Sequence, residues 1–93
     1  MKSVILYTMD GCPHCSNFKS LLKEANIIFD ERNIKDNEKE YKQFVEATKN
    51  EYLPAFTLVD VDEGKKPKIE LKVPDDDFSD LNEALQIVKD FIL

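Results

Sequence analysis

The chain has 93 residues, of which 42% are hydrophobic and 34% are charged, and its formal net charge is −6 at pH 7. This balance excludes a disordered chain, which has fewer apolar residues, and a disulfide-stabilised scaffold, which has more than the two cysteines present here. The length suits one domain over residues 1–93, and the negative charge disfavours phosphate-rich partners. We therefore expect a single domain, a monomer that binds neither nucleic acid nor a membrane.

The first predicted element is a buried strand over residues 2–8, where Val4, Ile5, Leu6 and Tyr7 form a continuous apolar run. This run is too short for the apolar region of a signal peptide and far too short to span a membrane. We therefore expect a cytoplasmic protein. In a reducing compartment a cysteine pair is more often catalytic or metal-binding than structural.

A helix is predicted to begin at Pro13, because proline suits the first helical turn, where its missing N–H has no partner to lose. Phe18 and Leu22 belong to an apolar face at helical spacing, and Asn26 is a suitable residue to end the helix. The apolar residues 27–29 are expected to begin a second strand that runs to residue 33 or 34.

After a turn at residues 35–37, the spacing of the apolar residues, Phe44 among them, predicts a second amphipathic helix that ends near Asn50. Pro54 then precedes a run of apolar and β-branched residues at 55–59, which predicts a third strand.

A turn at residues 62–65 leads into residues 68–73, where apolar and polar residues alternate strictly. This alternation predicts the half-buried second strand of a hairpin. A loop with three consecutive aspartates follows, and residues 81–92 form the last predicted helix. The order β-α-β-α-β-β-α predicts an α/β fold in which a four-stranded mixed sheet carries helices on both faces.

Cys12 and Cys15 are separated by Pro13 and His14 at the predicted start of the first helix. A Cys-x-x-Cys pair there can open and close a disulfide with little backbone movement, and the helix N-terminus stabilises a thiolate. We expect Cys12 to be the attacking nucleophile because it lies nearer the helix start. Cys15, one turn further along, is expected to be less accessible and to resolve the mixed disulfide.

Pro13 and His14 are expected to modulate this dithiol. Pro13 makes the turn rigid and removes an N–H that the thiolate would otherwise use. For His14 two interpretations stay open: a protonated ring would favour the thiolate of Cys12, and a solvent-exposed ring would have little effect on it.

The segment YTMDGCPHC, at residues 7–15, resembles the active-site segment of glutaredoxins, within the thioredoxin-fold superfamily. The family's second signature is a Val/Leu-Pro dipeptide with a cis peptide bond that opens the third strand, and Leu53 and Pro54 match it. The order of the elements also agrees over nearly the whole chain. The resemblance implies a thioredoxin-like fold in one glutaredoxin-like domain, and a thiol-disulfide oxidoreductase without a tightly bound cofactor or metal.

The resemblance further implies that glutathione is the co-substrate and that disulfide-containing proteins or glutathione mixed disulfides are reduced. A cis Pro54 would lie beside Cys12, and Leu53 would bind the cysteinyl part of glutathione through its main chain.

The γ-glutamyl end of glutathione would meet the loop before the last helix, where two registers stay open. One register places residues 76–77 at the ligand, Asp77 among them, and the other places Ser79 and Asp80 there. Independently of any ligand, Asp77 or Ser79 is expected to cap the last helix.

Three features differ from the common family pattern: Met9 stands where many members have Lys or Arg, His14 replaces an aromatic ring, and residues 71–80 lack a Gly-Gly pair. These differences favour an alternative, a redoxin of the same fold that a flavoprotein similar to thioredoxin reductase reduces. Such a redoxin would donate electrons to an enzyme such as ribonucleotide reductase.

Other classes rank lower. His14 lies between the two cysteines and is poorly placed to converge with them on zinc, so we expect no metal site. A binding module that merely uses the fold would not need an intact dithiol. The tetrapeptide CPHC also resembles strongly oxidising periplasmic thiol oxidases, but these are exported and we expect no export signal here.

Overall fold

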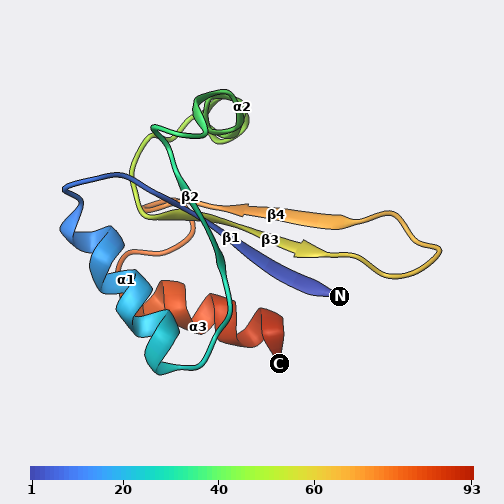
Figure 1. Cartoon of the computed structure of the whole chain (residues 1–93). Helices are drawn as coiled ribbons and strands as arrows, with labels where there is room; N and C mark the ends of the chain where they lie inside the picture. Colours follow the sequence, from blue (N-terminus) through green and yellow to red (C-terminus); the bar gives the residue numbers. More distant parts are fainter.

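The structure, a computed structural model, describes all residues from 1 to 93. Its elements are β1 (Lys2–Thr8), α1 (Pro13–Glu24), β2 (Asp30–Asn33), α2 (Glu38–Thr48), β3 (Ala55–Asp60), β4 (Lys68–Lys72) and α3 (Leu81–Ile92) (Figure 1). This order confirms the predicted sequence of strands and helices. None of the helices has the length and apolar character needed to cross a membrane.

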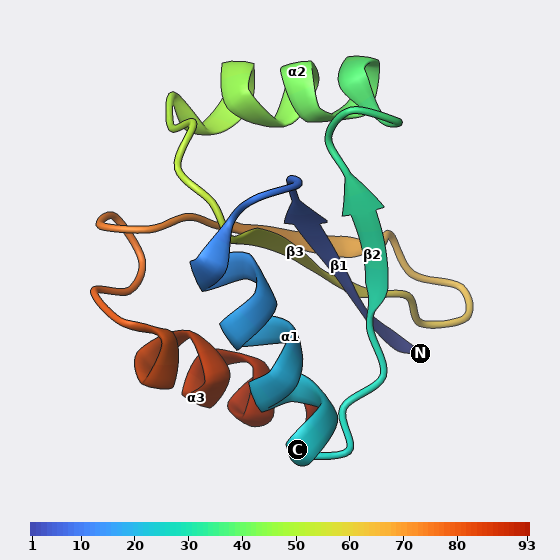
Figure 2. The ribbon, with the colours of Figure 1, turned by 60° about the vertical axis from the view of Figure 1, so that its left-hand side comes forward.

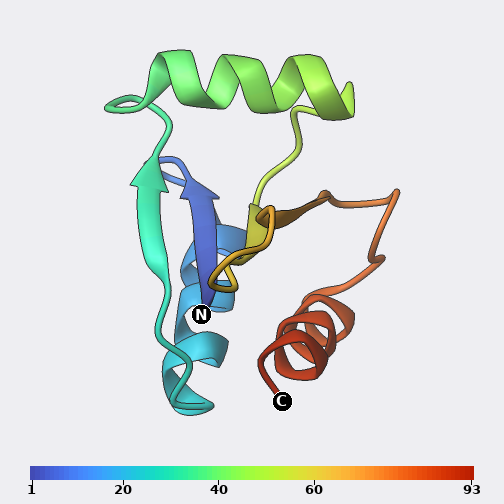
Figure 3. The same cartoon turned by 90° about the vertical axis from the view of Figure 1, so that its right-hand side faces the viewer.

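The strands form one mixed sheet in the order β2-β1-β3-β4. β1 and β2 are parallel, whereas β3 is antiparallel to both β1 and β4. Helix α2 lies on one face of the sheet, and α1 and α3 lie side by side on the other (Figures 2 and 3). The predicted α/β thioredoxin-like architecture, with helices on both faces, is therefore confirmed.

Alternation along β1 divides the core between the two faces of the sheet. Val4 and Leu6 point toward α1 and α3, whereas Ile5 and Tyr7 point toward α2. The larger buried cluster lies under α1 and α3 and comprises Val4, Leu6, Phe18, Leu22, Phe56, Leu58, Phe78, Ala84 and Val88. The smaller one lies under α2 and comprises Tyr7, Phe44, Ala55 and Val73.

The second strand begins later than predicted, because residues 27–29 form the connection between α1 and β2. Asn26 adopts a left-handed backbone conformation with a φ of 58°, and the N–H of Ile27 donates to the carbonyl of Leu22 at 2.9 Å. This is the Schellman pattern of a helix end, in which the residue after the left-handed position also packs against the helix. Ile27 accordingly packs against the larger cluster, whereas Ile28 is 92% exposed.

The predicted strand at residues 68–73 is one residue shorter in the structure, and its alternation does not produce a half-buried face along its whole length. β4 is an edge strand whose hairpin with β3 extends beyond the helices (Figure 1). Ile69 is therefore 60% exposed, and burial begins only at Leu71 and becomes complete at Val73.

Candidate active site

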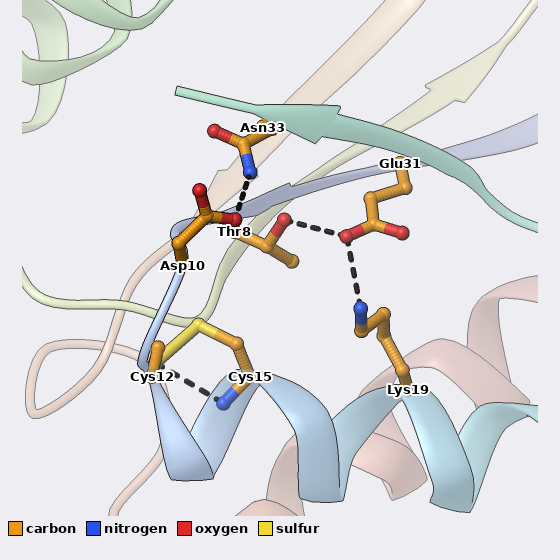
Figure 4. A network of polar contacts seen from close by, with 7 residues as sticks. All are labelled: Thr8, Asp10, Cys12, Cys15, Lys19, Glu31 and Asn33. Atoms are coloured by element: carbon orange, nitrogen blue, oxygen red, sulfur yellow. Dashed lines mark hydrogen bonds and ion pairs between the residues drawn. A yellow bond between two sulfur atoms is a disulfide. The ribbon is translucent and has the colours of Figure 1, made fainter. Parts of the chain in front are cut away.

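The structure contains a disulfide between Cys12 and Cys15, whose Cα atoms are 5.3 Å apart (Figure 4). Cys12 is the N-cap residue of α1, and its Sγ accepts a hydrogen bond from the backbone N–H of Cys15 at 3.2 Å. Pro13 occupies the first turn of the helix. The sulfur of Cys12 therefore lies where the unpaired N–H groups and the macrodipole of a helix favour an anion.

The two sulfurs differ in accessibility. Cys15 is 1% exposed, whereas Cys12 is half-buried. An external disulfide can thus reach the sulfur of Cys12 more easily than that of Cys15. This difference supports the predicted roles of attacking and resolving thiol, which stay predictions.

A pocket of about 310 Å³ reaches His14, which lies between the two cysteines in the sequence. Its lining residues are His14, Leu53, Pro54, Pro74, Phe78, Ser79, Asp80 and Leu81. The pocket brings the predicted modulator His14, which is exposed, together with both segments that the sequence predicts for glutathione. The peptide bond between Leu53 and Pro54 is cis, as the family resemblance implies.

Asp77 does not line this pocket. Its Oδ2 accepts a hydrogen bond from the backbone N–H of Val73 at 2.8 Å, and its own N–H donates to the Val73 carbonyl at 3.0 Å. Asp77 therefore braces the loop between β4 and α3.

The cap of α3 differs from the prediction, because it is neither Asp77 nor Ser79. Asp80 is the N-cap residue, and its Oδ1 accepts a hydrogen bond from the N–H of Glu83 at 2.8 Å. The Ser79 hydroxyl donates instead to the carboxylate of Glu83, which thereby reaches back across the helix start. A capping residue must have an extended backbone directly before the first helical residue, and Asp80 meets that condition with a φ of −145° and a ψ of 171°.

A polar network near the disulfide joins α1 to β1 and β2 (Figure 4). The hydroxyl of Thr8 donates to Oε2 of Glu31 at 2.7 Å, and the same oxygen accepts from Nζ of Lys19 at 3.0 Å. The hydrogen bond from Thr8 lowers the pKa of Glu31 below its usual value, and the hydrogen bond and positive charge of Lys19 lower it further. Sequence reasoning missed this network because its members come from three separate elements.

Contacts with the end of β2 and with the residue after it fix the turn that leads into Cys12. Nδ2 of Asn33 donates to Oδ1 of Asp10 at 3.0 Å, and the N–H of Ile34 donates to the carbonyl of Thr8 at 2.8 Å. Gly11 follows with a φ of 75°, a conformation that favours glycine. These contacts fix the path of the chain immediately before the dithiol.

On the opposite face of the sheet, Tyr7 ties α2 to β1. Its hydroxyl donates to Oε2 of Glu40 at 2.7 Å, and burial together with this contact raises the pKa of Tyr7 far above its usual value. Oε1 of Glu40 also accepts from Arg32 of β2 at 3.2 Å. The network holds α2 in place but does not reach the disulfide. In the structure, no group of three or more His, Cys, Asp or Glu side chains is arranged to hold a metal ion.

A sequence model of the glutaredoxin family matches residues 4–58 of the chain. Over 43 residues, the chain is 33% identical to Glutaredoxin 1 of Rickettsia felis, a match that covers 46% of this chain and 42% of the relative. Glutaredoxin 1 of Rickettsia prowazekii is also 33% identical over 43 residues, which cover 46% of this chain and 45% of the relative. The chain thus spans less than half the length of these curated relatives. The matched family segment contains the disulfide and the cis proline.

Proposed function

This chain belongs to the glutaredoxin family, and on that premise we propose that it is a thiol-disulfide oxidoreductase. It reduces protein disulfides or glutathione mixed disulfides through a reversible disulfide between Cys12 and Cys15. The observation that carries the proposal is the unequal pair at the start of α1, a half-buried cysteine at the helix N-cap and a fully buried cysteine one turn later.

The proposed reaction proceeds in two exchanges. The thiolate of Cys12 attacks one sulfur of the substrate disulfide, forms a mixed disulfide and releases the other sulfur as a thiolate, which takes a proton from water. The thiol of Cys15 then loses its proton to water, and the resulting thiolate attacks the sulfur of Cys12. This second step releases the reduced substrate and leaves the disulfide seen in the structure, so two electrons pass from the protein to the substrate.

Regeneration by glutathione is the reverse chemistry with two glutathione molecules. The first attacks the disulfide between Cys12 and Cys15 and forms a mixed disulfide on Cys12. The second attacks the glutathione sulfur of that mixed disulfide. The two glutathione molecules then leave together as oxidised glutathione, and both cysteines are thiols again. Glutathione therefore acts as a co-substrate that binds and dissociates in each cycle, and the proposed reaction uses no tightly bound cofactor.

Leu53 is well placed to hold the cysteinyl part of glutathione. It lines the pocket that reaches His14, and no backbone hydrogen bond within the protein involves its N–H or C=O. An extended peptide that lies along Leu53 and Pro54 can use both groups, as a peptide does when it pairs with a strand.

For the γ-glutamyl end we favour the register that uses Ser79 and Asp80, because these residues line the pocket and Asp77 does not. The carboxylate of Asp80 uses Oδ1 to cap α3, which leaves Oδ2 to accept from the ammonium group of glutathione. Asp77 is engaged with the backbone of Val73 instead.

The flavoprotein-dependent alternative is supported by the surroundings of the dithiol. Met9 lies just before the turn that leads into Cys12. It is 47% exposed, and its side chain has no positive charge to offer a glutathione carboxylate. The exposed carboxylates of residues 75–77 add negative charge to the loop before α3, and this charge disfavours an anionic tripeptide. Under either proposal we place the protein in a reducing, cytoplasmic setting.

A coupled assay separates the two donors. NADPH oxidation is followed with a disulfide substrate in the presence of glutathione and glutathione reductase, and in parallel with thioredoxin reductase alone. We expect turnover with glutathione, and its loss when Cys12 is replaced by Ser. Turnover with thioredoxin reductase and none with glutathione would establish the alternative, and turnover in neither system would refute both.

A further inference from the structure

Asn50 is a polar residue that is only 8% exposed, and it begins the segment that carries Leu53 and Pro54 into the pocket. Its Oδ1 accepts a hydrogen bond from the backbone N–H of Tyr52 at 2.8 Å. Its Nδ2 donates to the backbone carbonyl of Pro74 at 2.8 Å and makes a longer contact of 3.4 Å with Oδ2 of Asp76. One amide thus holds two segments that are far apart in the sequence.

Both of these segments are walls of the pocket. The first wall, residues 50–54, ends at Leu53 and Pro54, and the second wall, residues 73–80, contributes Pro74, Phe78 and the start of α3. The acceptor for Asn50 in the second wall, the Pro74 carbonyl, belongs to a residue that itself lines the pocket.

The two walls differ in their internal support. The second wall is braced by the contacts between Asp77 and Val73 and by a hydrogen bond of 2.8 Å from the N–H of Asp75 to the carbonyl of Phe78. The first wall is held at its start from α2, where the hydroxyl of Tyr41 donates to the carbonyl of Glu51 at 3.2 Å, but Leu53 itself makes no backbone hydrogen bond within the protein. Among the side-chain hydrogen bonds of the structure, those from Asn50 to Pro74 and Asp76 are the ones that join the two walls.

We propose that Asn50 is a positioning residue that sets the spacing between the Leu53 wall and the Ser79 wall. This inference rests on the proposed function, because its consequence is the affinity for a substrate that touches both walls. The side-chain amide meets the requirement, since its oxygen accepts from Tyr52 while its nitrogen donates to Pro74.

The test compares Asn50→Ala and Asn50→Asp with a matched control, Asn37→Ala. Asn37 lies at the opposite end of α2, where its Nδ2 donates to the carbonyl of Asn33 at 2.9 Å, and it does not line the pocket. The control thus removes one hydrogen bond between a side chain and the backbone without touching either wall. The folded state of each variant is checked by its thermal unfolding.

In the glutathione-coupled assay, we expect Asn50→Ala to raise the KM for a glutathione mixed disulfide about tenfold while kcat changes less than about twofold. The rate at which iodoacetamide alkylates Cys12 in the reduced protein should not change, because α1 is untouched. Asn50→Asp keeps the acceptor for Tyr52 but loses the donor to Pro74, so it should raise the KM as well. A KM that stays at the wild-type value in Asn50→Ala, or that rises equally in Asn37→Ala, would overturn the inference.

Amide hydrogen exchange followed by NMR tests the spacing without any substrate. In Asn50→Ala, the amide of Tyr52 should exchange faster, and the amide resonances of Leu53 and Ser79 should shift, while the amides in β1 and β3 keep their protection. Unshifted resonances in both walls would refute the positioning role even in an active protein. If the wild type reduces no disulfide, the proposed function fails separately, and this measurement still decides the role of Asn50.

Discussion

At the scale of single residues, the chemistry of this chain depends on the unequal environments of its cysteines. Cys12 caps α1 and is accessible, whereas Cys15 is buried one turn later. A helix N-cap stabilises a thiolate, and burial shields the second thiol until the first has reacted. The proposed division of roles, with attack by Cys12 and resolution by Cys15, rests on these two positions.

Replacement of Cys15 separates the two proposed exchanges. In Cys15→Ser, Cys12 can still form a mixed disulfide, but the protein cannot close its own disulfide. We expect reduction of glutathione mixed disulfides to persist, because a second glutathione can resolve them, and reduction of protein disulfides to fall by at least about tenfold. Steady-state assays with the two kinds of substrate check this, and equal loss for both would contradict the division of roles.

Glu31 is expected to make stability depend on pH. Its pKa is lowered in the folded protein by Thr8 and Lys19, so it stabilises the fold above the pKa of about 4.3 of an unfolded chain. That contribution is lost as the pH falls through the lower, folded-state pKa. Because the carboxylate is 38% exposed, we expect Glu31→Gln to cost no more than about 1 kcal/mol at pH 7.

Urea unfolding of the wild type and of Glu31→Gln at several pH values measures this difference. It should be largest near pH 7 and should shrink at acid pH, as the pH falls through the lowered pKa of the wild-type carboxylate. A difference that stays constant down to acid pH would mean that the charge of Glu31 does not contribute.

At the scale of elements, the start of α3 combines a structural and a proposed binding role in one residue. Asp80 caps the helix through Oδ1 and also lines the pocket. Asp80→Ala should lower the free energy of unfolding by about 1 kcal/mol, because the N–H of Glu83 loses its acceptor.

Asp80→Ser separates the two roles, because serine is also a good N-cap but has no carboxylate. We expect this variant to unfold at nearly the wild-type urea concentration and to show a raised KM for glutathione. If Asp80→Ser has the wild-type KM, the carboxylate does not bind the γ-glutamyl end, and the register with Ser79 and Asp80 is wrong.

Local sequence patterns predicted the elements well and their ends less well. The periodicities of two and of about 3.6 residues located all the strands and helices. The start of β2 was misplaced because Asn26 ends α1 with a Schellman motif, which uses Ile27 as a packing residue rather than a strand residue. The cap of α3 was misassigned because Asp77, Ser79 and Asp80 have similar capping propensities, and only the path of the loop selects among them.

The dithiol and the cis proline could be predicted because each is marked by a short local motif. The wall-joining role of Asn50 could not, since it exists only where two loops meet. The hydrogen bonds of Asn50 to Pro74 and Asp76 cross 24 and 26 positions of sequence, and no local pattern records such a contact. The network of Thr8, Lys19 and Glu31 could not be predicted either, because its members come from three separate elements.

At the scale of the whole molecule, the sheet and the α1–α3 layer share one aromatic core next to the site. Phe56 of β3 is fully buried, and its ring centroid lies 5.6 Å from that of Phe18 and 5.7 Å from that of Phe78. Phe78 also lines the pocket. The core therefore supports α1, which carries the dithiol, and the second wall of the pocket at once.

Phe56→Ala should reduce the free energy of unfolding by about 3–5 kcal/mol, because it removes the buried contacts of this ring and leaves a cavity between Phe18 and Phe78. Urea unfolding measures this loss. Ile28→Ala is the control, because Ile28 is 92% exposed and its replacement should change stability by less than about 0.5 kcal/mol. A similar small loss for both variants would mean that the aromatic cluster is not the core of the fold.

The most direct test of the mechanism compares Cys15→Ser and Cys12→Ser after reduction, each incubated with oxidised glutathione and followed by intact-protein mass spectrometry. Each variant keeps one cysteine, so the rate of glutathione addition reports the reactivity of that thiol alone. The N-cap position and the exposure of Cys12 predict that Cys15→Ser gains glutathione at least about tenfold faster than Cys12→Ser. Equal rates, or faster addition to Cys15, would contradict attack by Cys12.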